Sequence, residues 1–223
     1  MNRLVLIYFE IKGRLRYLSH SELIRLFQRA CARAGIRLAY AGRFNPRPKL
    51  DLPLPKPVAV EADADILTLR LDAGNSQTQP SEETCRQIKD RLNAQLPLGC
   101  KVISVFSSQS KDAVQPTCAE YLFELQNSLY QDPGFRRQLH HRIENLIKEP
   151  RILLRRSQKN KSKQLDVRPF ILSIVASSGV VRVRTKITNN GTIRVNELEN
   201  LLNLENNMLA RPVRRVGICC QQN

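Results

Sequence analysis

Apolar and polar positions alternate in several short segments, and this two-residue period predicts β-strands. The first such segment is RLVLIYFEIK at residues 3–12, which is rich in β-branched and aromatic side chains. The pattern returns in the second half of residues 60–72 and at 99–108. Five prolines lie within residues 43–57. They exclude an ordinary helix and a central strand there, so we expect an edge strand or a polyproline segment, preceded by a strand at 36–42.

Helical periods separate these strands. Leu23, Phe27 and Ala30 recur at helical spacing within residues 20–34, and Ser19 with Glu22 forms a capping box at the start of that segment. A second amphipathic helix is expected at 80–94. The resulting order is strand, helix, two strands, helix, strand. That order is typical of the split βαβ, or ferredoxin-like, fold.

The second half of the chain repeats this order of elements. After strand 119–126 and a helix at about 132–147, strand 151–155 leads into a polar, cationic loop at 157–164. A hairpin with its turn at 177–179, a short helix and a final strand follow. We therefore expect an α+β protein made of two tandem ferredoxin-like domains, residues 1–108 and 119–223, joined by a linker at 109–118.

The chain has a large excess of basic residues, with 36 Lys and Arg against 20 Asp and Glu and a net charge of +16. Residues 12–49 contain ten of these cations and one acid, Glu22. A surplus of this kind favours a polyanionic partner, most often nucleic acid, over a surface that is merely solvated.

Several classes of site are excluded by the motifs that the sequence lacks. The six cysteines include no CxxC spacing and the chain has three histidines, so we expect no metal or iron–sulfur site. No glycine-rich nucleotide motif and no GxSxG or HExxH motif is present. Without a signal sequence or a long apolar run, we expect a cytoplasmic protein with reduced thiols and no membrane span.

The segment RFNPRPK at 43–49 is the strongest candidate for ligand contact. Its prolines restrict the backbone, so Arg43, Arg47 and Lys49 lose little further freedom on meeting a phosphate. Asn45 could read a base edge or cap a turn. Phe44 could stack on a base or fill the core, and we favour the core because aromatic side chains are usually buried.

Further candidates lie on the first helix and in the cationic loop of the second half. Arg25 and Arg29 recur every four residues on one helix face, and we expect them to contact phosphates together with Arg16. His20, in the first turn, could act as a general base on a ribose hydroxyl or be an ordinary first-turn residue. The loop is interpreted as a phosphate-steering arm or as a solvated loop, and it contributes Arg155, Arg156 and Lys159.

Two adjacent histidines stand in the predicted helix of the second half. His140 and His141 are accompanied by Arg136, Arg137 and Arg142. Because neighbouring residues on a helix point apart, a basic helix face is the favoured interpretation over a metal-binding pair.

The first sixty residues, including RYLSHSELIR, RAGIRLAYAGRFNPRPK and VAVEA, resemble the radical-SAM-linked bacterial domain family. The later KQLDVRPFILSI and the closing ARPVRRVGI are similar to its second half. In this family, members are fused to or encoded beside a radical S-adenosylmethionine (SAM) enzyme. The chain has Glu22 where the family usually has Asp, and Arg47 where it often has His.

The resemblance implies a standalone accessory protein. The partner enzyme would carry the iron–sulfur cluster and SAM, and this chain would hold neither cofactor and would not itself be an enzyme. We expect it to bind RNA through its basic surface. The alternatives are a metal-independent endoribonuclease that uses His20, as the architecture of CRISPR repeat-processing nucleases suggests by analogy, and a module that docks an acidic protein.

Overall fold

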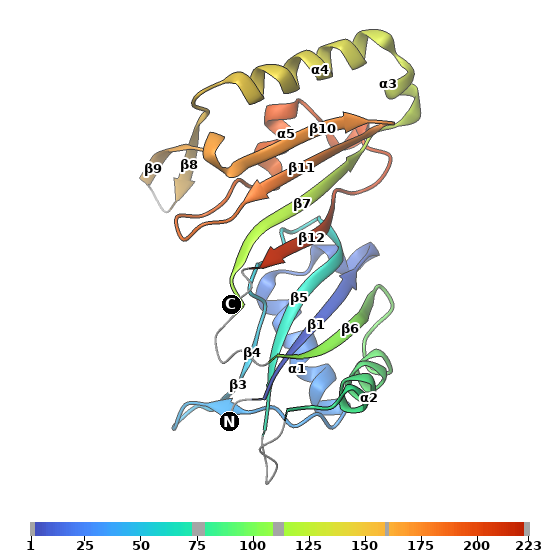
Figure 1. The fold of residues 1–223 in the computed structure, drawn as a ribbon, viewed down its shortest axis with the longest axis vertical. Helices are drawn as coiled ribbons and strands as arrows, with labels where there is room; N and C mark the ends of the chain where they lie inside the picture. Colours follow the sequence, from blue (N-terminus) through green and yellow to red (C-terminus); the bar gives the residue numbers. More distant parts are fainter. Residues whose placement is uncertain (1–2, 73–78, 109–113, 159–160, 221–223) are drawn as a thin grey trace. The chain divides into compact units, whose positions relative to one another are not determined.

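The structure is a computed structural model that describes residues 3–72, 79–108, 114–158 and 161–220. It divides into two compact units, of which unit 1 is Met1–Pro116 with Cys220–Asn223 and unit 2 is Thr117–Cys219. Each unit combines strands with helices, and the described residues contain five α-helices (Figure 1). The predicted α+β class is therefore confirmed.

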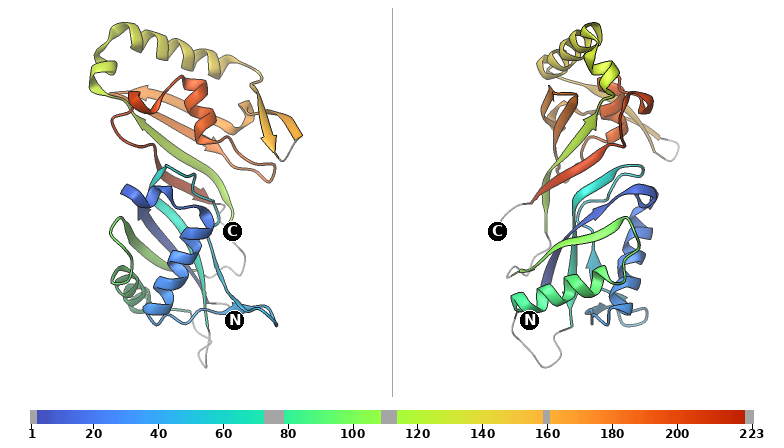
Figure 2. Two further views of the ribbon diagram at one scale, coloured as in Figure 1. Left: turned by 180° about the vertical axis from the view of Figure 1, so that it is seen from behind. Right: turned by 90° about the vertical axis from the view of Figure 1, so that its right-hand side faces the viewer.

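Unit 1 is built on an antiparallel sheet in the order β4-β5-β1-β6. Viewed from behind, α1 lies in front of this sheet (Figure 2). The elements of unit 1 are β1 (Arg3–Ile11), the 3-10 helix η1 (Gly13–Tyr17), α1 (His20–Arg33), β2 (Tyr40–Ala41), β3 (Arg47–Pro48), β4 (Leu50–Asp51), β5 (Glu61–Leu71), α2 (Glu82–Asn93) and β6 (Cys100–Ser108).

The core of unit 1 forms where one face of α1 meets the sheet. Leu23, Phe27 and Ala30 are completely buried, as their helical spacing predicts. The ring of Phe27 packs edge-on against that of Phe9 on β1, with centroids 4.7 Å apart. The predicted capping box is present, because the Ser19 side chain accepts from the Glu22 amide and the Glu22 carboxylate accepts from the Ser19 amide. α1 is thus fixed at its start and along one face, which leaves its other faces in solvent.

The chain between α1 and β5 differs from the strand expected at 36–42. Only Tyr40–Ala41 forms a strand, with an isolated bridge between Leu38 and Leu71 before it. The expectation of one continuous strand is wrong because the chain leaves the sheet here to form the hairpin β2–β3, whose two strands have two residues each. The proline-rich segment returns to the sheet as β4, which pairs with β5 at the edge as predicted.

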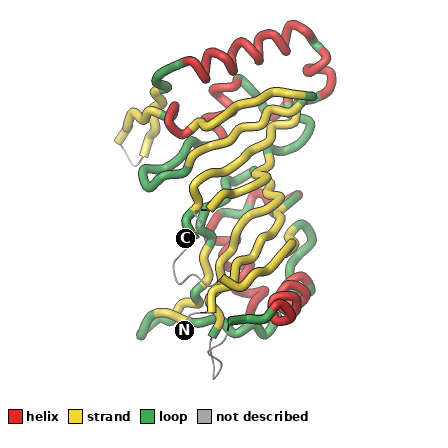
Figure 3. The backbone as a smooth tube through the Cα atoms, in the orientation of Figure 1, coloured by secondary structure: helices red, strands yellow, loops and turns green. Residues whose placement is uncertain are grey.

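Unit 2 has the sheet order β10-β11-β7-β12, and its strands lie side by side in the tube drawing (Figure 3). α4 packs against β10 and α5. Its elements are β7 (Pro116–Glu124), α3 (Asn127–Gln131), α4 (Pro133–Lys148), β8 (Leu153–Gln158), β9 (Lys161–Asp166), η2 (Arg168–Phe170), β10 (Ile171–Ser177), β11 (Val180–Lys186), α5 (Val195–Leu202), η3 (Asn206–Met208) and β12 (Arg214–Cys220).

Two expectations for unit 2 are corrected. Within the segment expected to be a loop at 157–164, the described residues 157–158 and 161–164 belong to the antiparallel strands β8 and β9, in which Leu153 pairs with Asp166. The expectation of reduced thiols fails for Cys118 and Cys219, which are joined by a disulfide because neighbouring β7 and β12 place their Cα atoms 5.0 Å apart. Among the described residues, no helix is both long and apolar enough to cross a membrane.

Candidate nucleic-acid interface

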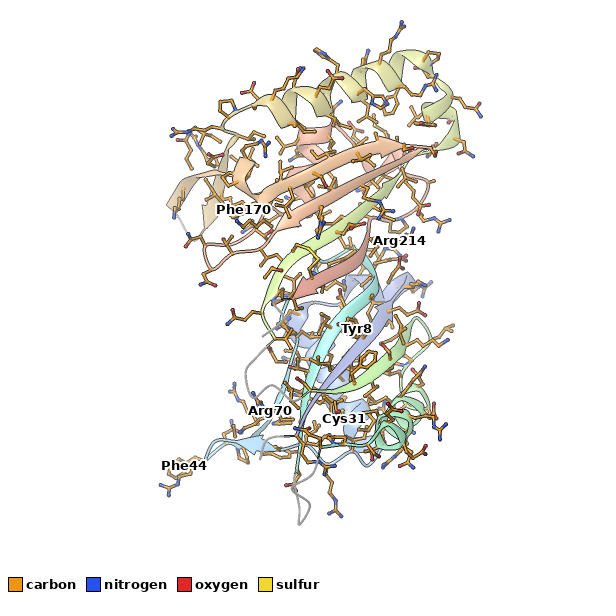
Figure 4. The ribbon with its side chains drawn as sticks, viewed as in Figure 1. Tyr8, Cys31, Phe44, Arg70, Phe170 and Arg214 are labelled. Atoms are coloured by element: carbon orange, nitrogen blue, oxygen red, sulfur yellow. A yellow bond between two sulfur atoms is a disulfide. The ribbon has the colours of Figure 1, made fainter. Side chains whose placement is uncertain are left out.

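The hairpin β2–β3 carries Phe44 at its tip. Tyr40 pairs with Pro48 and Ala41 with Arg47, so residues 42–46 form the turn. Gly42 adopts a φ of +97°, and a Cβ there would lie 3.0 Å from the Asn45 carbonyl oxygen, so the tight turn requires glycine. Phe44 is fully exposed, at 102 %, and projects from the tip (Figure 4). The favoured core position for Phe44 is therefore wrong, because the hairpin carries the ring away from the sheet.

The polar residues of the hairpin are free to meet a ligand. Arg43, Asn45 and Arg47 are exposed, and Lys49 is partly exposed. In the part of the chain that the structure describes, none of these three cations forms a salt bridge. The Lys49 backbone is anchored between Ala39 and Arg70, at 2.7 and 2.9 Å. The base of the hairpin is thus held by the scaffold, while the charges at its tip are unneutralised.

The arginines of α1 line a groove of about 680 Å³ between that helix and the turn at residues 94–97. Arg25, Arg29 and Arg33 lie along it, with Leu18 and Leu26 as apolar lining. Within the described ranges, neither Arg25 nor Arg29 makes a salt bridge. We call this the α1 groove. Its row of guanidinium groups is of the kind that binds phosphate groups.

Two lining residues of the α1 groove are engaged locally. Arg33 donates to the Gln95 carbonyl at 2.7 Å, which ties the helix to the turn. Glu22 is the acidic residue of the lining. Hydrogen bonds from the side chain and backbone of Ser19, helped by the charge of Arg25, lower the pKa of Glu22. The capped carboxylate stays ionised, but one negative charge against the guanidinium groups of Arg25, Arg29 and Arg33 leaves the lining of the α1 groove net positive.

Arg16 and His20 lie near the start of α1, and both are partly exposed. The Arg16 guanidinium stacks 4.4 Å from the Tyr17 ring centroid and donates to the Tyr17 hydroxyl at 2.8 Å. His20 Nδ1 is buried and has no hydrogen-bond partner among the described residues. The catalytic alternative, which would need a group that orients this imidazole, stays a prediction.

The residues predicted to form a cationic arm in the second half differ in their exposure and contacts. Arg155 is exposed, whereas Arg156 forms a salt bridge with Glu197 at 2.6 Å and donates to the Thr192 carbonyl at 2.7 Å. Arg156 is therefore not available to a phosphate, and its inclusion in the arm is wrong because it stabilises unit 2 internally. Lys159 lies outside the described residues. The described residues contain no cluster of three or more His, Cys, Asp or Glu side chains that could hold a metal ion.

Comparison with known proteins identifies the family. The family model described as "Uncharacterized protein conserved in bacteria (DUF2344)" matches residues 4–200. The chain belongs to this family. No curated protein matches the sequence of this DUF2344 member.

One solved structure similar to the DUF2344 chain is titled "Crystal Structure of a Cbf5-Nop10-Gar1 Complex". The aligned chains share 12 % sequence identity and superpose with a TM-score of 0.45. The alignment covers 96 % of the DUF2344 chain and 48 % of the other, so the chain spans about half the length of that protein.

The structure adds two features to the interface that the sequence did not single out. Tyr40, at the base of the hairpin, is 61 % exposed and is a second aromatic side chain near Phe44 in the chain. Leu96 and Pro97 complete the wall of the α1 groove opposite the arginines. Tyr40 could have been suspected from its place two residues before Gly42. The wall could not, because it depends on how α2 and its following turn pack beside α1.

Proposed function

We propose that unit 1 of this DUF2344 protein binds single-stranded RNA, with phosphates in the α1 groove and a base stacked on Phe44. The observation that carries this proposal is the complete exposure of Phe44 between Arg43 and Arg47, cations without salt bridges in the described structure. An exposed aromatic ring costs solvation free energy unless a ligand covers it, and bases stack on such rings in single-stranded complexes. Flanking guanidinium groups supply the attraction to the backbone.

We further propose that each unit is ferredoxin-like and that the chain presents its RNA to a separate radical SAM enzyme. Support for the fold comes from the strand orders β4-β5-β1-β6 and β10-β11-β7-β12 and from the placement of α1 and α2 between consecutive strands of unit 1. Support for the partner comes from the resemblance of residues 12–62, which include the hairpin.

Fluorescence anisotropy with a labelled single-stranded RNA of about 20 nucleotides tests the RNA proposal. Phe44→Ala should weaken binding by about 1–3 kcal/mol, or roughly 5- to 150-fold, because the stacking surface is lost. Phe44→Tyr should retain most of the affinity, because its ring still stacks. Phe106→Ala, which removes another exposed aromatic side chain of unit 1, is the control and should bind as wild type does.

The same assay at several salt concentrations tests the α1 groove. Arg29→Gln should lower the slope of log K against log salt by about 0.7, the value for one phosphate of a single strand. Arg86→Gln should leave the slope unchanged, because Arg86 is paired with Glu83 on α2. A wild-type affinity that does not change with salt would reject phosphate-driven binding. Retention of the radical SAM enzyme without RNA would instead favour the docking of an acidic protein.

A further inference from the structure

A second basic groove of about 540 Å³ lies along α4 in unit 2. Its lining includes Tyr130, Arg136, Arg137, His140 and His141, with Glu144 as the acidic member. All four basic side chains are exposed. We call it the α4 groove. The sequence predicted a basic helix face here, and the structure gives that face a concave surface.

The charge of the α4 groove is not neutralised by the protein. Among the described residues, Arg136 and Arg137 form no salt bridge. Glu144 faces Lys148, with 3.6 Å between its carboxylate and the Lys148 amine, so the acid is offset by a cation outside the lining. A groove with two unpaired guanidinium groups attracts an anion with several negative charges.

Local contacts orient the groove before any ligand arrives. The Arg136 guanidinium lies 5.7 Å from the Tyr130 ring centroid, within the range of a cation–π interaction. The Tyr130 hydroxyl accepts from the Ser178 amide at 3.0 Å in the β10–β11 turn, which holds the ring in place. His141 is 3.1 Å from the Asn145 amide nitrogen, one turn along the helix. Preorganised cations bind a phosphate at a lower entropic cost than mobile ones.

We propose that the α4 groove is a second phosphate-binding site for the same RNA, so that one chain grips a strand through both of its units. This inference rests on the proposed function of unit 1. It predicts that a strand long enough to reach both sites binds more tightly than a short one, because the second contact forms at high effective concentration.

Imidazole proton NMR tests the two sites separately, because the chain has three histidines. His20 reports on unit 1, and His140 and His141 report on the α4 groove; single His→Gln variants assign the signals. On titration with single-stranded RNA, we expect the signals of His140 and His141 to move. Arg136→Gln/Arg137→Gln should abolish that movement, reduce the salt slope by about 1.4 and leave the His20 response intact.

Arg142→Gln/Arg151→Gln is the matched control, since it removes two exposed charges outside the groove lining, one on α4 and one just after its end. If both double variants lose the same affinity for RNA, the α4 groove is not a specific binding site. The loss would then reflect only the lower net charge of the protein. If RNA moves the His20 signal alone, the α4 inference fails while the proposed function of unit 1 stands. If anisotropy detects no RNA binding by the wild type, both proposals fail.

Discussion

The Nζ atom of Lys56 is surrounded by backbone carbonyls in unit 1. It donates to the carbonyls of Arg16, Pro57 and Val60, at 2.7, 2.9 and 3.0 Å, and the side chain is 4 % exposed. These contacts tie η1 to the segment that follows the prolines. Lys56 thereby fixes both the residues before α1 and the return of the chain from the hairpin to the sheet.

Lys56→Met should lower the free energy of unfolding by about 2–4 kcal/mol, because buried carbonyls lose their donor. Chemical denaturation followed by circular dichroism measures the change. Lys49→Met is the control and should shift the unfolding free energy by less than about 0.5 kcal/mol, because Lys49 is partly exposed. A Lys56→Met protein as stable as wild type would show that those carbonyls find other partners.

Individual residues also show how far the sequence alone can predict this protein. The pairing of Ser19 with Glu22 was predictable because a helix cap is made by residues three apart. The exposure of Phe44 was not, because it depends on where the hairpin leaves the sheet. The groove-facing cations of α1 were found from their four-residue spacing, whereas Arg156 was misassigned because its partner, Glu197, lies 41 residues away.

At the scale of elements, the pair Arg156–Glu197 joins the hairpin β8–β9 to the start of α5. Both side chains are largely buried, at 17 % and 11 % exposure. Burial alone would raise the pKa of Glu197, but hydrogen bonds from Arg156 and from the Arg194 backbone outweigh it and lower that pKa. The pair therefore stabilises unit 2 while the carboxylate is ionised.

Arg156→Gln should reduce the unfolding free energy by about 3 kcal/mol at neutral pH, because it leaves a buried carboxylate unpaired. The folded pKa of Glu197 lies below its unfolded value of 4.5, so the stabilisation is complete above that pH and is lost as pH falls through the folded pKa. The melting temperatures of wild type and Glu197→Gln should therefore differ at pH 7 and become more similar as the pH is lowered to 3.

Arg155→Gln supplies the matched control for this element, since Arg155 is exposed and adjacent. It should change the unfolding free energy by less than about 0.5 kcal/mol at every pH. Equal effects of the two arginine substitutions would contradict the assignment of Arg156 to the scaffold.

The hairpin β8–β9 and the helix α1 differ in how they could be predicted. α1 could be predicted from the helical spacing of its apolar residues and from the capping box at its start, both of which involve only residues close in the sequence. The start of β8 was predicted within the strand at 151–155, but the described residues 157–158 and 161–164 are polar or cationic and lack the apolar alternation by which strands are found, and they are strands because they pair with each other. The sequence gives strand identity reliably only where one face of the strand is buried.

At the scale of the whole molecule, the disulfide Cys118–Cys219 joins the first and last strands of unit 2 across 101 residues. Closing so long a loop restricts the unfolded chain, and native disulfides typically contribute about 2–4 kcal/mol. Cys31 and Cys100 stay unpaired and buried, and burial raises the pKa of each thiol to about 12, with a further contribution from Glu10 for Cys100. These thiols are therefore poor nucleophiles.

Dithiothreitol should lower the melting temperature of the oxidised protein, because it opens this loop. The Cys118→Ala/Cys219→Ala protein should melt lower than the oxidised wild type and should not respond to the reductant. Differential scanning calorimetry measures both effects, and mass spectrometry after alkylation counts the free thiols. A wild-type melting temperature that ignores the reductant would show that the disulfide does not stabilise unit 2.

The β2–β3 hairpin has one more consequence for the molecule as a whole. Residues 42–47 are exposed, and the turn they form depends on the conformation of Gly42. The side chains at positions 43–45 can therefore be exchanged with little effect on folding, provided that the glycine stays. Residues 43–45 can thus determine which ligand is bound while contributing little to the stability of the fold. Substituting these three residues could therefore change the ligand specificity of the same scaffold.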